Sequence, residues 1–279
     1  VGDIVLSWIV TPLIAGILAF MIFQTVHHLI LKQKNPLEKA KKYVPVYMFI
    51  TAFILTLVTI KKGLKHIGLG VSDNEAYIYA VIAGVIVSII GAIFVSKIKV
   101  DKEKEKEFHF YTVEKVFGVL MVITASGLAF AHGSNDVANA VGPLAAVVAT
   151  AKSGAVAAKA GVDAWILLLG GVGIVIGLAT YGVRVIRTVG QKITHLTPSR
   201  GFAAELAAST TIVVASGTGM PISTTQTLVG AVLGVGMARG ISAIDLGVVR
   251  SIFASWVITI PAGASLSIVF FFILKAIFS

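Results

Sequence analysis

The sequence predicts an all-α, polytopic membrane protein. Of its 279 residues, 57% are hydrophobic and 13% are charged, and the mean hydropathy is +0.95. Soluble domains average about 45–50% apolar and about 25% charged residues. The charges stand in short clusters between long apolar runs, which excludes a soluble globular domain, a disordered chain and, despite the net charge of +10, a nucleic-acid-binding domain. The absence of cysteine also excludes disulfides and thiolate metal sites.

Apolar stretches of about 20 residues are long enough to cross a bilayer as helices. We expect such spans at 4–31, 44–60, 76–96, 112–131, 164–183 and 252–274. The segment 97–107 alternates Lys with Asp and Glu, a pattern typical of a solvated linker. Lysine and arginine counts alternate between high and low in successive connecting segments, and the positive-inside rule then places the linker 97–110 in the cytoplasm. We therefore expect a multi-pass protein of the plasma (inner) membrane, in contact with lipids.

Two further apolar regions contain interruptions and predict broken helices. Polar residues and Gly142-Pro143 interrupt 131–151, where a half-helix would begin near Val137. The sequence 216–221, rich in Gly, Ser, Thr and Pro, divides 201–239 into arms of 15 and 17 residues, each marginal for a full crossing. Such a break predicts a re-entrant helical hairpin that is buried in protein or lines a wet cavity, because irregular backbone is too costly in lipid.

The first and last spans share a sequence pattern. Ser7-Trp8-Ile9-Val10-Thr11 resembles Ser255-Trp256-Val257-Ile258-Thr259, at an offset of 248 residues. Inverted or parallel repeats are common in secondary transporters. At this offset the counterparts of Asp136 and Thr224 would precede residue 1, so we expect one complete repeat and the tail of another. The predicted divisions are 1–96 (end of the first repeat and connecting helices), the charged linker 97–110, and 111–279 (second repeat).

Asp136 is the ionisable residue that stands deepest in an apolar region. On a helix, His132, Asp136 and Asn139 share one face, with Asn135 beside them. A carboxylate with amide oxygens nearby suits a hard monovalent cation, and burial would also suit it to proton exchange. The alternative is that Asp136 caps a half-helix. Asn135, Asp136 and Asn139 are therefore our candidate cation ligands.

Ser223-Thr224-Thr225-Gln226 opens an apolar helix. Ser223 and Gln226 fit the capping-box pattern S-x-x-Q. A buried helix start also offers free backbone N–H groups and a positive dipole end, to which the hydroxyls add donors, so it can hold an anion. Neither Lys nor Arg lies between Arg200 and Arg239, and neutral donors would bind an anion weakly enough to release it. The two interpretations are compatible.

Glu205 lies in one apolar arm, five residues after Arg200. A salt bridge at the membrane edge and a gating or coupling role are both open for this pair.

An intramembrane serine hydrolase is disfavoured, because His132 is badly spaced for Ser134 and the sequence has no G-x-S-x-G elbow. We expect no enzyme activity; a channel or scaffold would differ from a symporter in lacking dependence on an ion gradient.

Three stretches together resemble the inorganic phosphate transporter family of sodium- or proton-coupled permeases. They are Asn135-Asp136-Val137-Ala138-Asn139-Ala140, Thr197-Pro198-Ser199-Arg200-Gly201-Phe202-Ala203-Ala204-Glu205 and Pro221-Ile222-Ser223-Thr224-Thr225-Gln226. They occur in the order typical of that family. The resemblance implies two inverted repeats, each with its own copy of the motifs, that hold phosphate and sodium near the midplane.

The resemblance also implies site residues and partners. Phosphate would contact Ser223, Thr224, Thr225 and Gln226, together with Asn135 and Asp136, and Na⁺ would be the coupling ion, with no cofactor. We expect import by alternating access and assembly as a homo-oligomer. A sulfate or other oxyanion permease of the same fold, or coupling to H⁺, remain the alternatives.

Overall fold

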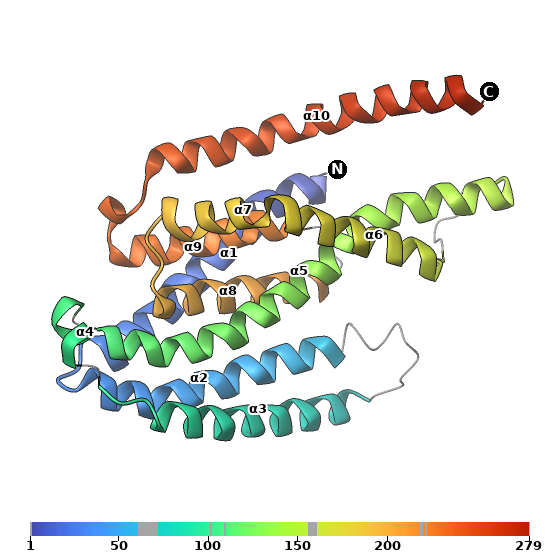
Figure 1. The fold of residues 1–279 in the computed structure, drawn as a ribbon. Helices are drawn as coiled ribbons and strands as arrows, with labels where there is room; N and C mark the ends of the chain where they lie inside the picture. The colour runs from blue at the N-terminus through green and yellow to red at the C-terminus, as the bar shows by residue number, and fades with distance from the viewer. Residues whose placement is uncertain are drawn as a thin grey trace.

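The computed structural model describes residues 2–60, 72–100, 102–108, 110–155, 161–217, 220 and 222–278. These residues are nearly all helical and include no strand, so the predicted all-α fold is confirmed. Figure 1 shows long helices running roughly side by side. Within the described residues, six helical stretches are long and apolar enough to cross a membrane: Leu6–Leu31, Pro36–Leu57, Asn74–Ser96, Tyr111–Ser153, Ala164–Lys192 and Leu246–Phe278. They correspond to the six predicted spans.

The helices follow one another with short connections. In chain order they are α1 (Gly2–Val26), the π-helical η1 (His27–Leu31), α2 (Pro36–Val58), α3 (Asp73–Ser96), α4 (Lys102–Glu107), α5 (Tyr111–Ser153), α6 (Ala164–Gly177), η4 (Leu178–Gly182), α7 (Val183–Arg187), η5 (Thr188–Lys192), α8 (Pro198–Gly217), α9 (Thr224–Arg239), η6 (Ile241–Ala243) and α10 (Leu246–Phe278).

The predicted break in 131–151 is wrong, because α5 is one continuous helix of 43 residues. Its polar residues find partners one turn away on the same helix: His132 contacts Asp136, and Asn139 Nδ2 donates to Asn135 Oδ1 over 3.2 Å. Asp136 therefore does not cap a half-helix. At about 1.5 Å per residue, α5 is about 65 Å long, roughly twice the thickness of a bilayer core.

A helical hairpin is present, because α8 and α9 pack against each other. That the hairpin is re-entrant stays a prediction. Of the break between them, Thr218, Gly219 and Pro221 lie outside the described residues. Arg239, at the end of α9, donates from Nη1 to Thr194 Oγ1 over 3.1 Å, and Thr194 lies just before α8 begins. The chain therefore enters and leaves the hairpin at the same end.

The start of α8 is fixed by a carboxylate that sequence reasoning did not single out. Glu114, in the first turn of α5, is 8% exposed. It accepts hydrogen bonds from Thr197 Oγ1 (2.7 Å), Ser199 N (2.7 Å) and Ser199 Oγ (2.8 Å). An acidic group at a helix N-terminus stabilises the helix. Glu114 thus ties the hairpin to α5.

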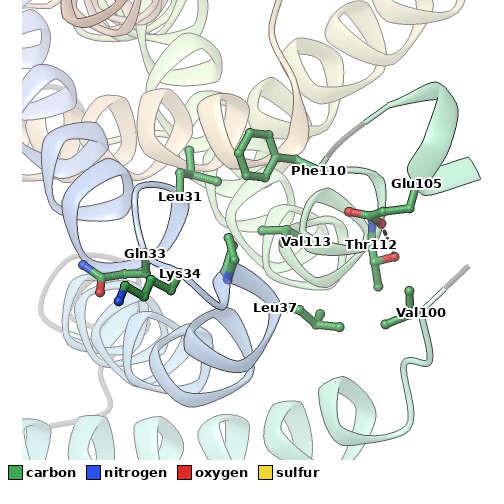
Figure 2. Close-up of a pocket in the computed structure, with 10 residues that line it drawn as sticks. Leu31, Gln33, Lys34, Leu37, Val100, Glu105, Phe110, Thr112 and Val113 are labelled. Atoms are coloured by element: carbon green, nitrogen blue, oxygen red, sulfur yellow. Dashed lines mark hydrogen bonds between the residues drawn. The ribbon is translucent and has the colours of Figure 1, made fainter. Parts of the chain in front are cut away.

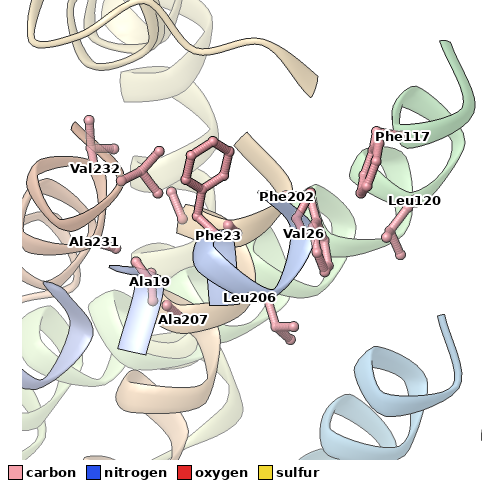
Figure 3. Packing of buried hydrophobic residues seen from close by; sticks show 14 of the residues in the cluster. Ala19, Phe23, Val26, Phe117, Leu120, Phe202, Leu206, Ala207, Ala231 and Val232 are labelled. Carbon is pink, nitrogen blue, oxygen red and sulfur yellow. The ribbon is translucent and has the colours of Figure 1, made fainter. Parts of the chain in front are cut away.

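The hydrophobic core lies where α1, α2, α5, α8 and α9 meet. Figure 3 shows Phe23 of α1, Phe117 of α5 and Phe202 of α8 among the buried side chains. α1 crosses α9 at close range, because a Cβ at Gly230 would overlap the backbone of Pro12 and one at Gly234 that of Gly16. Helices from the predicted divisions 1–96 and 111–279 therefore share one core, and the division itself stays a prediction.

α10 contacts this core only through its first part, where Val248, Val249, Ile252 and Trp256 pack against it. None of its described residues is fully buried, and Figure 1 shows it along one side of the bundle. Trp8 of α1 and Trp256 of α10, which occupy equivalent positions in the predicted sequence repeat, line the same cavity. The inverted repeat itself stays a prediction.

Candidate functional site

The candidate site is built on the start of α9. Ser223 is the N-cap residue, with extended backbone angles, and its Oγ accepts from Gln226 N over 3.3 Å. Ser223 O accepts from Thr227 N over 3.0 Å. In the described part of the chain, the N–H groups of Thr224 and Thr225 have no such partner. These are the free donors that a helix start presents to an anion.

The predicted capping box is only half formed. Ser223 receives the N–H of Gln226, but the carboxamide of Gln226 does not reach back to the N-cap residue. Among the described residues, Gln226 Oε1 is one of two buried side-chain polar atoms without a hydrogen-bond partner. Gln226 as a whole is 9% exposed.

Thr224 joins the two predicted motifs. Its side chain is buried, and its Oγ1 donates to the Asp136 carboxylate, 3.0 Å from Oδ1 and 3.2 Å from Oδ2. His132 Nε2 contacts the same carboxylate from the preceding turn of α5. Asp136, which is about 30% exposed, is therefore held from two sides. Residues 88 positions apart in the sequence meet at this point.

The other proposed cation ligands are less close to this contact. Asn139 is exposed, and its amide is bonded to Asn135 rather than to Asp136. In the part of the chain that the structure describes, no group of three or more His, Asp or Glu residues is arranged to hold a metal ion. A cation at Asp136 would therefore depend on hydroxyl, amide and backbone oxygens, and its site stays a prediction.

A cavity of about 980 Å³ lies on the other face of the α9 start, between α1, the η4–η5 segment and α10. Ser223, Thr225 and Gln226 line it. The remaining polar lining residues are Tyr181, Arg184, Thr188, Ser255 and Thr259, and the apolar ones include Trp8, Phe253 and Trp256. The start of α9 thus presents Thr224 to Asp136 and its other three polar residues to a cavity.

Arg184 is a cationic residue of this cavity that sequence reasoning missed. We expected its span to end at 183 and counted Arg184 with the following connection, but the helical stretch continues to Lys192. Arg184 Nη1 donates to Tyr181 OH over 3.3 Å, and its guanidinium lies 5.0 Å from the centre of the Tyr181 ring. The three-residue spacing from Tyr181 was the available signal, because residues three apart share a helix face.

Glu205 and Arg200 are not joined by a salt bridge among the described residues. Glu205 Oε2 instead accepts from Thr124 Oγ1 of α5 over 2.6 Å, and Arg200 Nη1 donates to the His195 carbonyl over 3.1 Å. The interpretation of this pair as a membrane-edge salt bridge is therefore wrong. In the described part of the chain neither residue is bonded to the start of α9, and their gating role stays a prediction.

A smaller pocket of about 250 Å³ lies at another place, between the turn after η1 and the start of α5 (Figure 2). It contains none of the predicted site residues. Glu105 of α4 accepts from Thr112 N (3.0 Å) and Thr112 Oγ1 (2.6 Å), as Figure 2 shows. The charged linker is therefore anchored to α5 at this pocket.

Comparisons with known proteins agree with the motifs. Residues 1–267 match the Phosphate transporter family. A Haemophilus influenzae protein named "Putative phosphate permease" is 53% identical over 283 residues, which cover 100% of this chain and 66% of that protein. A protein of the same description from Pyrococcus abyssi is 42% identical, with 98% and 65% covered.

One solved structure also resembles the chain. It is titled "The sodium-dependent phosphate transporter", with a TM-score of 0.78 and 36% identity, and the match covers 92% of this chain and 62% of that one. The chain thus spans about two thirds of the length of the relatives it matches.

Proposed function

The chain belongs to the phosphate transporter family, and from this membership we propose that it acts in a secondary transporter that imports inorganic phosphate together with Na⁺. The family is one of transporters and not of enzymes, and the apolar helices make the chain an integral membrane protein. The observation that carries the proposal is the position of the α9 start between the Asp136 carboxylate and a cavity.

Phosphate would bind on the cavity side of α9. The N–H groups of Thr224 and Thr225 and the hydroxyls of Ser223 and Thr225 are donors, and the positive end of the helix dipole favours an anion. Arg184, which lines the same cavity, adds a cationic donor of the kind that suits phosphate geometry. With Arg184 in the cavity, the anion would not be held by neutral donors alone, as the lack of Lys and Arg between Arg200 and Arg239 had suggested.

Na⁺ would bind at the Asp136 side of the same helix start. Thr224 contacts Asp136 directly, so a cation there would lie close to the anion on the neighbouring residues. Without the cation, the carboxylate and the phosphate would repel each other across a low-dielectric region. Both would therefore bind together, and rocking of the helix bundles would then expose the loaded site to the other side.

Coupling to H⁺ is the second candidate, and the contact between His132 and Asp136 favours it. A histidine beside a membrane carboxylate is typical of proton relays. Assembly as a homo-oligomer, location in the plasma (inner) membrane and a cytoplasmic linker remain predictions.

The test is radiolabelled phosphate uptake into liposomes that contain the complete gene product. Separate assays impose a Na⁺ gradient, a pH gradient or neither, with K⁺ as the replacement ion. We expect uptake to follow the Na⁺ gradient. Uptake that follows only the pH gradient would establish the H⁺-coupled candidate, and uptake without any gradient dependence would contradict both.

A further inference from the structure

Gln226 is the polar residue whose chemistry the site does not yet explain. It lies in the first turn of α9, lines the cavity with Ser223 and Thr225, and is 9% exposed. Its Oε1 is a buried acceptor without a partner in the described part of the chain. Buried acceptors are almost always hydrogen-bonded, because leaving one unpaired costs stability. A turn of the Gln226 side chain toward the cavity, which this residue lines, would bring Oε1 to a donor on a ligand there.

The other polar groups at this end of the cavity are suited to donate. The free N–H group of Thr225 and the guanidinium of Arg184 are donors only, and the hydroxyls of Ser223 and Thr225 can turn to donate. Such groups match the unprotonated oxygens of an oxyanion. Gln226 Oε1 differs from all of them, because it can only accept.

We propose that Gln226 Oε1 accepts a hydrogen bond from the protonated oxygen of phosphate, and that this bond makes the site select phosphate over sulfate. The inference rests on the phosphate transport proposed above. At neutral pH inorganic phosphate keeps at least one proton, whereas sulfate has none. The O–H of phosphate therefore satisfies Oε1, but a sulfate oxygen in the same place faces it with lone pairs.

Selection of this kind is strong. A site built to hydrogen-bond a hydroxyl rejects an analogue that lacks it, because the buried partner is then left unpaired. We expect sulfate to bind at least about 100-fold more weakly than phosphate. The competing explanation is a carboxamide turned by 180°, which would aim its N–H groups at the anion. Those donors would bind phosphate and sulfate alike.

A ligand-side experiment separates these explanations without any substitution. Monofluorophosphate is a tetrahedral dianion with fluorine in place of the hydroxyl, so it cannot donate. In liposomes with the complete gene product, we expect it to inhibit phosphate uptake at least about 10-fold more weakly than unlabelled phosphate. Equal inhibition by the two compounds would overturn the inference.

The protein-side experiment compares sulfate and phosphate as competitors in three variants. Gln226→Met removes the acceptor, and we expect the preference for phosphate over sulfate to fall at least about 10-fold. Gln226→Glu keeps an acceptor and loses the N–H donors, so the preference should persist even if uptake slows. Gln191→Met makes the same change at an exposed residue of η5 that does not line the cavity, and should leave the preference unchanged.

Four results would count against the inference. Equal weakening of both anions in Gln226→Met, or loss of the preference in Gln226→Glu, would mean that the carboxamide donates. Sulfate that competes as well as phosphate in the unchanged protein would overturn selectivity while leaving phosphate transport intact. Absence of phosphate uptake in the unchanged protein would instead overturn the proposed function, and this inference with it.

Discussion

Helices α3 and α9 both begin with a serine followed three residues later by Glu or Gln: Ser72 and Glu75 in α3, and Ser223 and Gln226 in α9. In α3 the box is complete, since Glu75 N donates to Ser72 Oγ (3.3 Å) and Glu75 Oε2 accepts from Ser72 N and Oγ (2.8 Å each). In α9 only the bond from Gln226 N to Ser223 Oγ is made.

The two capping boxes differ because the start of α3 is exposed and the start of α9 is largely buried. Ser72 and Glu75 are exposed, so closing the box there only exchanges water for protein partners. Thr224 and Gln226 are buried beside a cavity, where an unpaired polar group costs about 1–3 kcal/mol. The open box of α9 is therefore an unfavourable arrangement for folding alone. It becomes favourable when an anion supplies the missing partners.

The largest effect is expected at the carboxylate that Thr224 contacts. Asp136→Asn should lower Na⁺-driven phosphate uptake about 100-fold and remove its dependence on Na⁺, because loss of a partly buried charged ligand costs about 1.5–3 kcal/mol. Uptake would be measured in liposomes across a range of Na⁺ concentrations. Normal Na⁺-driven uptake in this variant would end the cation role of Asp136.

Asp163→Asn is the matched control for that substitution. Asp163 lies just before α6, is about half exposed and is bonded to Lys152 Nζ over 2.9 Å. This hydrogen bond lowers the pKa of Asp163, so the control also removes a full negative charge at neutral pH. Because an exposed ion pair contributes little, uptake should stay unchanged.

Thr224 is expected to give the next largest effect. Thr224→Val keeps the size of the side chain but removes the hydroxyl that contacts Asp136, so the KM for phosphate should rise about 10-fold. Thr224→Ser should restore most of it. Thr210→Val, which removes a hydroxyl bonded only to the Leu206 carbonyl of its own helix, is the control. Equal effects at positions 210 and 224 would indicate a packing role only.

The sequence was sufficient to locate the spans and the hairpin, because apolar length and a Gly-, Ser- and Pro-rich break act locally. It failed at α5, where the polar residues were expected to interrupt the helix. Their i, i+4 contacts on the helix itself satisfy them, and periodicity cannot tell that arrangement from a break.

The candidate site was also predictable only in part. The motifs indicated Asp136 and Thr224, and the structure brings them together. Arg184 was missed because its helical stretch extends past the apolar run, and only the packing of α1, α9 and α10 places it in the cavity. The incomplete capping box at Gln226 was also unpredictable, because the sequence pattern S-x-x-Q is the same whether or not the side chain of Gln bonds to the N-cap residue.

Substitution of the N-cap serines of α3 and α9 is expected to have a smaller effect and compares the two helix starts directly. Ser72→Ala should lower the thermal midpoint by about 2–4 °C and leave uptake unchanged, because it removes a cap and nothing else. Ser223→Ala removes a cap and a proposed phosphate donor, so uptake should fall about 10-fold with a similar thermal shift. Thermal unfolding in detergent and uptake would be measured for both variants. A fall in uptake with Ser72→Ala would contradict the distinction.

The smallest effect tests whether residue type alone explains the open box of α9. α3 has Glu and α9 has Gln at the third position, and both residues are compatible with a capping box. If Gln closes the box in the exposed setting of α3, Glu75→Gln should shift the thermal midpoint by less than about 1 °C, well below the shift of Ser72→Ala. A shift as large as that of Ser72→Ala would mean that Gln cannot replace Glu there. The free oxygen of Gln226 would then follow from its residue type, and its position beside the cavity would no longer be needed to explain it.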